Sequence, residues 1–148
     1  MIKELQFPNG GRLLGDWKNG DASSKKRLQE IFDATIAGEY DAIFSEAAPA
    51  NKVHCSASVN LMTLTIMHDL YGLDSAAFYK GDPERYVRTT LMSRKLLGMN
   101  KMYLSWVVYA FTAEAMGQSM TYPEEAPPGV DPGNLLINRD NWQDIQTP

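Results

Sequence analysis

A continuous run of apolar, β-branched and aromatic residues at 101–109 (KMYLSWVVY) constrains the fold of this chain more than any other feature of its sequence. Side chains of this kind favour a strand that is buried on both faces, as in the centre of a parallel sheet. A second, shorter strand is expected at 53–56. Helices are expected before, between and after these strands, so the order predicts parallel strands joined by helical crossovers, which is the α/β class.

Three helices are predicted from apolar periodicity and from the residues that favour helix ends. The first covers 24–37, with a serine as its cap, and the second covers 58–71. Each of the three is expected to stop at a glycine (Gly38, Gly72 and Gly98), and a short helix capped by Asp74 and reaching Phe78 is expected before the third. The third covers 82–97 and starts with Asp-Pro-Glu, in which Asp accepts free backbone N–H groups, Pro fits the first turn and Glu faces the positive end of the helix dipole. The basic residues of this third helix are expected to form a solvated face: Arg85, Arg88, Arg94 and Lys95.

The remaining segments have weaker patterns. Residues 1–22 hold scattered glycines without a period, and we expect an irregular arm that packs on the rest of the chain through its apolar residues. Residues 40–51 fit either a short strand or a helical turn. Residues 118–122 alternate polar and apolar side chains, as an edge or surface strand does, and the proline-rich segment 123–133 predicts a loop or linker.

Charge and composition exclude several classes of function. The 148 residues carry a net charge of −4, whereas nucleic-acid binding needs a basic surface. No apolar run approaches the roughly 20 residues that a membrane helix needs, and the first residues do not have the pattern of a secretion signal. The single cysteine, Cys55, cannot form an internal disulfide, as is usual in a reducing compartment. We therefore expect a cytoplasmic protein that binds neither nucleic acid nor membrane.

Four stretches occur in an informative order: 71–79 (YGLDSAAFY), 82–87 (DPERYV), 114–117 (EAMG) and 122–128 (YPEEAPP). In this order and spacing they resemble the N-terminal third of the uroporphyrinogen decarboxylase-like superfamily, which includes corrinoid-dependent methyltransferases that act on coenzyme M. The first stretch is similar to the family's segment after its first barrel helix. The second is similar to the start of the family's next helix. The third is similar to the turn after its second strand, and the fourth to the loop that follows this turn.

The resemblance implies a TIM barrel, of which residues 23–148 would form the N-terminal part, as βα units preceded by a helical region. A complete barrel needs eight strands and typically about 250 residues, so this chain is expected to form only part of one. The family's cofactors are zinc and a corrinoid, and its zinc-binding His and Cys residues lie in a C-terminal half that this chain does not contain. No cofactor is therefore expected in this chain. The expected partners are a second copy, a chain that supplies the C-terminal half, and a corrinoid protein.

The chain departs from the family at positions that carry chemistry. The decarboxylase has an arginine-rich segment where this chain has 54–60 (HCSASVN), and a central aspartate where it has Val108. An apolar group cannot stabilise a pyrrole cation, so porphyrinogen decarboxylation is not expected. The methyltransferases often carry an acid where Thr112 stands. Two functions stay open: a methyltransferase-type segment that is inactive on its own, and a non-catalytic ligand-binding or protein-interaction module derived from the same scaffold.

Three residues are expected to contact a substrate, and none is assigned as catalytic. His54 and Tyr109 lie near the C-terminal ends of the two predicted strands, where barrel active sites form, and Glu114 follows the second strand. Each has a structural alternative: a hydrogen-bonded histidine, a core aromatic ring, and a carboxylate that accepts a backbone N–H at a helix start. His54 and Cys55 are not expected to share a metal, because adjacent residues on a strand face opposite ways.

Overall fold

The computed structural model describes residues 9–39, 59–99, 108–124, 126–138 and 140–144. Within these ranges the chain is mainly helical, and its helices are α1 (Gly10–Lys18), α2 (Ala22–Ile36), α3 (Asn60–Tyr71), α4 (Ser75–Lys80), α5 (Pro83–Leu96) and α6 (Val108–Ala115). The strands among these residues are β1 (Met120–Thr121) and β2 (Gly129–Val130), and a 3-10 turn follows at η1 (Trp142–Asp144).

The prediction of an α/β fold with partial TIM-barrel βα units is wrong. The sheet of the described residues has two strands, which are antiparallel, with Met120 opposite Val130, and which need no helical crossover. The strand expected at 53–56 and most of the one at 101–109 lie outside the described residues. The last residue of the second run, Tyr109, is helical, because the run continues into an alanine-rich segment that favours helix and forms α6.

The N-terminal segment is not irregular throughout, since residues 10–18 form α1. Leu14 is buried in the core, and Leu13 and Trp17 pack against it, so the expectation that this segment packs on the rest is confirmed. These residues lie three or four positions apart on one helical face, a pattern that the surrounding glycines obscure in the sequence. Gly10 lies so close to α5 that a Cβ there would overlap the carbonyl oxygen of Leu96.

The helix predicted at 24–37 is α2, but its cap is an aspartate and not a serine. The carboxylate of Asp21 accepts a hydrogen bond from the backbone N–H of Ser24 at 2.7 Å, which satisfies one of the free donors at the helix start. The buried face of α2 is formed by Ser24, Leu28, Ile31, Phe32 and Thr35.

The predicted boundaries of the next three helices are confirmed within a few residues. α3 ends at Gly72, which has the left-handed conformation (φ 65°) that glycine adopts without strain. Asp74 caps α4 by accepting the backbone N–H of Ala77 at 2.7 Å. Asp82 caps α5 by accepting the N–H of Glu84 at 2.9 Å, with proline in the first turn, as expected.

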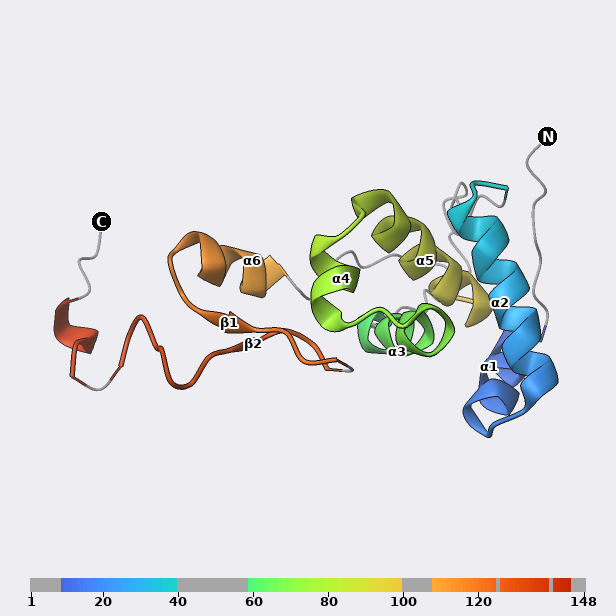
Figure 1. Ribbon diagram of the computed structural model, residues 1–148, viewed down its shortest axis with the longest axis horizontal. Helices are drawn as coiled ribbons and strands as arrows, with labels where there is room; N and C mark the ends of the chain where they lie inside the picture. Colours follow the sequence, from blue (N-terminus) through green and yellow to red (C-terminus); the bar gives the residue numbers. More distant parts are fainter. Residues whose placement is uncertain (1–8, 40–58, 100–107, 125, 139, 145–148) are drawn as a thin grey trace, which may run out of the picture.

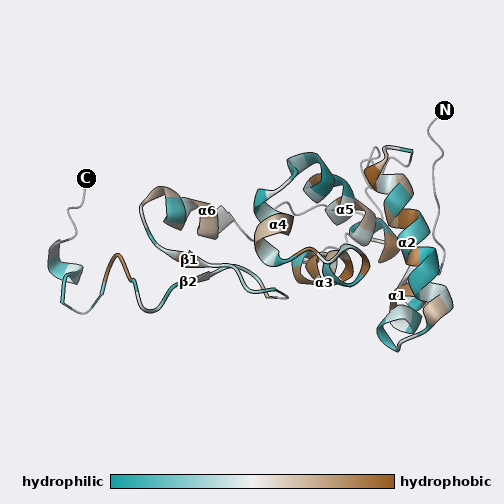
Figure 2. Cartoon of the chain, in the orientation of Figure 1, coloured by the Kyte–Doolittle hydropathy of each residue, from teal (hydrophilic) through white to brown (hydrophobic). Residues whose placement is uncertain are grey.

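Helix α5 lies at the centre of the molecule and contacts α1, α2, α3 and α4 (Figure 1). Figure 2 shows the apolar residues concentrated on α3, which is also part of this helical cluster. The largest fully buried apolar side chains are Phe32, Phe78, Leu28, Leu64, Ile66, Met67, Met92 and Leu96. The helical cluster α1–α5 therefore holds the main core of the described residues.

The basic residues of α5 were expected to form a solvated face, and this prediction is wrong for Arg94. Arg94 is fully buried, and this burial lowers the pKa of its guanidinium. A helix that packs on four others has too little free surface to expose all of its polar side chains. The contacts with those four helices determine which of its side chains are buried. Arg88, by contrast, forms an ion pair with Glu84 on the same helix at 2.6 Å.

Helix α6 and the β1–β2 hairpin lie beside α4, on the side away from α1 and α2 (Figure 1). After β2 the chain continues as an extended tail to η1, where the side-chain oxygen of Asn138 accepts the backbone N–H groups of Asp140 and Asn141. None of the helices among the described residues combines the length and apolar character needed to cross a membrane.

Candidate functional site

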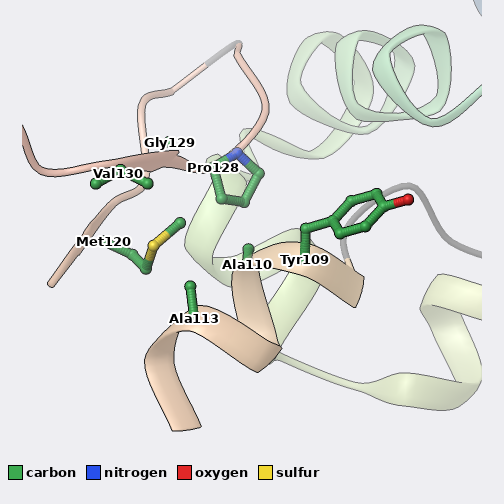
Figure 3. Close-up of a pocket in the computed structure, with 7 residues that line it drawn as sticks. All are labelled: Tyr109, Ala110, Ala113, Met120, Pro128, Gly129 and Val130. Carbon is green, nitrogen blue, oxygen red and sulfur yellow. The ribbon is translucent and has the colours of Figure 1, made fainter. Parts of the chain in front are cut away.

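A hollow of about 430 Å³ lies between α6 and the β1–β2 hairpin (Figure 3). Its lining residues come from both elements and are Tyr109, Ala110, Ala113, Met120, Pro128, Gly129 and Val130. In Figure 3, Ala110 and Ala113 point from α6 toward the hairpin, and Met120, Pro128 and Val130 stand on the opposite side. A volume of this size is typical of small-molecule pockets, which range from about 300 to 1,000 Å³.

The local sequence explains how the hollow forms. Ala110 and Ala113 are three positions apart and therefore lie on one face of α6, where their small side chains leave space in front of the helix. Met120 and Val130 are opposite each other in the hairpin register, so their side chains extend from the same face of the sheet. Gly129 adds no side chain. The hollow is therefore the space between a face of small residues and a face of large apolar ones.

Tyr109 lies at the rim of this hollow. Its side chain is 78% exposed, and in Figure 3 its ring extends from the start of α6 with the hydroxyl pointing away from the hairpin. The residue is thus not a core aromatic. The other lining residues that the structure describes have apolar side chains or, at Gly129, none.

Glu114 is held by an ion pair. Its Oε1 atom lies 2.6 Å from Nζ of Lys80, and the same Nζ lies 4.3 Å from the centre of the Tyr122 ring. The hydrogen bond from Lys80 holds the pKa of Glu114 below its ordinary value, and the same bond raises the pKa of Lys80, so both groups stay charged near neutral pH. Glu114 lies in the last turn of α6. It therefore does not accept a backbone N–H at the start of this helix, which was its structural alternative.

Of the three predicted substrate-contacting residues, the structure describes Tyr109 and Glu114, and it does not bring these two together as one site. His54 lies outside the described residues, as does Cys55. Tyr109 and Glu114 are both on α6, but five positions apart, which places them about 140° apart around the helix axis. Tyr109 borders the hollow, whereas Glu114 joins α6 to α4 through Lys80.

The lining of the hollow suits binding better than chemistry. Among the lining residues that the structure describes, none has a carboxylate, imidazole, amine or thiol that could act as general base or nucleophile. Elsewhere in the part of the chain that the structure describes, no three His, Cys, Asp or Glu side chains come close enough together to hold a metal ion. What this arrangement offers is an apolar surface for a ligand or a partner.

Sequence reasoning missed Lys80 and most of the hairpin wall. The alternation at 118–122 did predict β1, but the proline-rich segment 123–133 concealed β2 and with it the wall formed by Pro128 and Val130. Lys80 is 34 positions from its partner Glu114, and a basic residue followed by glycine at the end of a short helix gives no sign of that pairing.

Comparisons of the chain with protein-family models, with curated proteins and with solved structures found no match. The family resemblance therefore rests on the four stretches alone. In the structure the first, 71–79, ends α3 and forms most of α4, and the second, 82–87, caps and begins α5. The third, 114–117, ends α6, and the fourth, 122–128, links β1 to β2.

Proposed function

We propose that this chain is the N-terminal segment of a cytoplasmic uroporphyrinogen decarboxylase-like protein of the corrinoid-dependent methyltransferase type, and that it is inactive on its own. One observation carries this proposal: the four stretches that resemble the family form one connected region of the structure. Stretches derived from one scaffold are expected to pack on one another, as these four do.

The contacts between the four stretches are specific. The ring of Phe78 in the first stretch lies 5.2 Å from that of Tyr86 in the second, with an edge-on geometry that favours aromatic pairs. The backbone N–H of Ser75 in the first stretch donates to the carbonyl oxygen of Pro123 in the fourth at 3.3 Å. Lys80 follows the first stretch directly and joins the third to the fourth through Glu114 and Tyr122.

The residues present support the proposed inactivity of the isolated chain. The lining residues that the structure describes include no acid or base, and Val108 and Thr112 stand where the family carries acids. The residues beyond α5 expose many large apolar side chains: Tyr109, Phe111, Met116, Val130, Leu135, Leu136, Ile137 and Trp142. An apolar concentration of this kind favours contact with another polypeptide. A chain that supplies the C-terminal half, with the family's zinc ligands, is the proposed partner, and a corrinoid protein would deliver the methyl group.

A second candidate is a non-catalytic binding or interaction module derived from the same scaffold. The observation that favours it is the same apolar lining, together with the missing acids at Val108 and Thr112. The two candidates share the apolar surface and differ in whether a complex with the C-terminal half is active.

Co-expression of the chain with the C-terminal half of a coenzyme M methyltransferase tests both candidates. The first predicts a stable complex that holds zinc and transfers the methyl group of methylcobalamin to coenzyme M, measured by the change in corrinoid absorbance, while the chain alone is inactive. Leu136→Asp, on the exposed apolar surface, should weaken the complex, whereas Glu30→Gln on α2 should not. A stable complex without methyl transfer favours the second candidate. Methyl transfer by the isolated chain, or the absence of any complex, contradicts the first.

A further inference from the structure

We propose that the hollow between α6 and the β1–β2 hairpin is a binding site for a small, uncharged aromatic ligand. Every lining residue that the structure describes lies within this chain, at 109–130, and the test below uses the isolated chain, so its outcome does not depend on the proposed function. Its volume of about 430 Å³ accommodates a ligand of one or two fused rings.

The lining excludes a charged ligand. A charged group moved from water into an apolar site loses hydration that nothing in this lining replaces. Of the charged groups next to the lining residues in the sequence, Glu114 is paired with Lys80 at 2.6 Å, and Asp131 accepts hydrogen bonds from the Gly133 N–H and from the Asn134 side chain. The ligand is therefore uncharged.

The lining favours a ring over an aliphatic chain. The Met120 thioether makes favourable contacts with the edges of aromatic rings. The Pro128 ring on the hairpin side offers a further flat surface against which a planar ligand can pack. Ala110 and Ala113 form a low wall opposite Met120, so that a planar group fits between α6 and the hairpin.

Indole is a suitable probe because it is planar and uncharged and has a single N–H. Chain labelled with ¹³C at the methionine methyl groups is titrated with indole, and the Met120 signal is assigned from the spectrum of Met120→Leu. We expect a saturable shift of the Met120 methyl signal and nuclear Overhauser contacts between that methyl group and the indole ring. Indole-3-acetate, which has the same ring and a carboxylate, should bind at least about tenfold more weakly.

Two alanines of α6 provide a matched pair of variants. Ala113→Leu fills the hollow and should weaken indole binding at least about tenfold, whereas Ala115→Leu adds the same side chain at an exposed position outside the lining and should change it less than about twofold. If Ala113→Leu does not fold, judged by circular dichroism, the Overhauser contacts in the unmodified chain decide. A shift that does not saturate, contacts to methionines other than Met120, or equal binding of indole-3-acetate would overturn the proposal.

Discussion

The ammonium nitrogen of Lys80 lies 2.6 Å from Oε1 of Glu114 and 4.3 Å from the centre of the Tyr122 ring. One side chain at the end of α4 thus contacts both α6 and the hairpin. A hydrogen bond from the Ser75 N–H to the Pro123 carbonyl oxygen supports the same junction. The position of the hollow relative to the helical cluster depends on these contacts.

Lys80→Met should loosen the junction without unfolding the cluster, because methionine keeps an apolar stem over the Tyr122 ring but removes the charge that holds Glu114. We expect faster chymotrypsin cleavage after Phe111 of α6, the helix that the Lys80–Glu114 pair holds against α4, with unchanged circular dichroism. Raising the salt concentration should bring the cleavage rate of the unmodified chain toward that of the variant, since the pair is partly exposed. Arg27→Met is the control, because the Arg27–Glu30 pair lies within α2. Equal cleavage rates for Lys80→Met and the unmodified chain would contradict this role.

Gly10→Ala should destabilise the chain by about 1–3 kcal/mol, because the added Cβ would overlap the carbonyl oxygen of Leu96 and force α1 away from α5. Gly11→Ala is the matched control. A Cβ at Gly11 has no heavy atom within 4 Å, so this substitution should stabilise by about 0.5–1 kcal/mol through helix propensity. Urea unfolding followed by circular dichroism measures both. Equal effects of the two substitutions would show that α1 does not pack closely on α5.

Asp82→Ala should cost about 1 kcal/mol of unfolding free energy, because it leaves the N–H of Glu84 without its acceptor at the start of α5. Asp82→Asn keeps a side-chain oxygen for this bond and should lose much less. The comparison is made by urea unfolding under identical conditions. A loss as large for asparagine as for alanine would mean that the charge at the helix end, and not the capping bond, is the stabilising feature.

The hydrogen bonds of Asp69 predict how the stability of the folded chain depends on pH. Its carboxylate accepts hydrogen bonds from Lys25 at 2.6 Å and from the Trp17 indole at 2.8 Å, and these bonds lower its pKa. Because the folded pKa lies below the unfolded one, this contribution to stability is complete above the ordinary aspartate pKa of about 3.9 and is lost as the pH falls through the lower folded value. The indole N–H signal of Trp17 should shift over that acidic range. Asp69→Asn should abolish this shift, and a shift that persists in the variant would assign it to another group.

The sequence predicted those parts of the fold that depend on neighbouring residues. The caps at Asp74 and Asp82 and the stops at Gly72 and Gly98 are local, since each involves a side chain or a backbone angle within a few residues of the helix end. They could therefore be located without knowledge of the tertiary structure.

The predictions were wrong where contacts between residues far apart in the sequence determine the structure. Tyr109 ends an apolar run that suits a buried strand, yet a short apolar run does not distinguish strand from helix, and here the following alanines extend a helix back over its last residue. Arg94 has the same local pattern as a solvated arginine and is buried because α5 packs on four helices. For the candidate site, Tyr109 was predicted at the end of a strand and Glu114 after it, whereas both lie on α6, and the wall at Met120 and Val130 depends on a strand pairing hidden among prolines.

The central position of α5 also determines when the chain can fold during its synthesis. Each earlier helix, from α1 to α4, contacts α5, and Gly10 near the start of the chain packs on Leu96 at the end of that helix. Until Leu96 has left the ribosome, α1–α4 must expose the apolar faces that α5 later covers. The nascent chain is therefore most exposed to aggregation and to chaperone binding just before α5 emerges, and it becomes protected in one cooperative step.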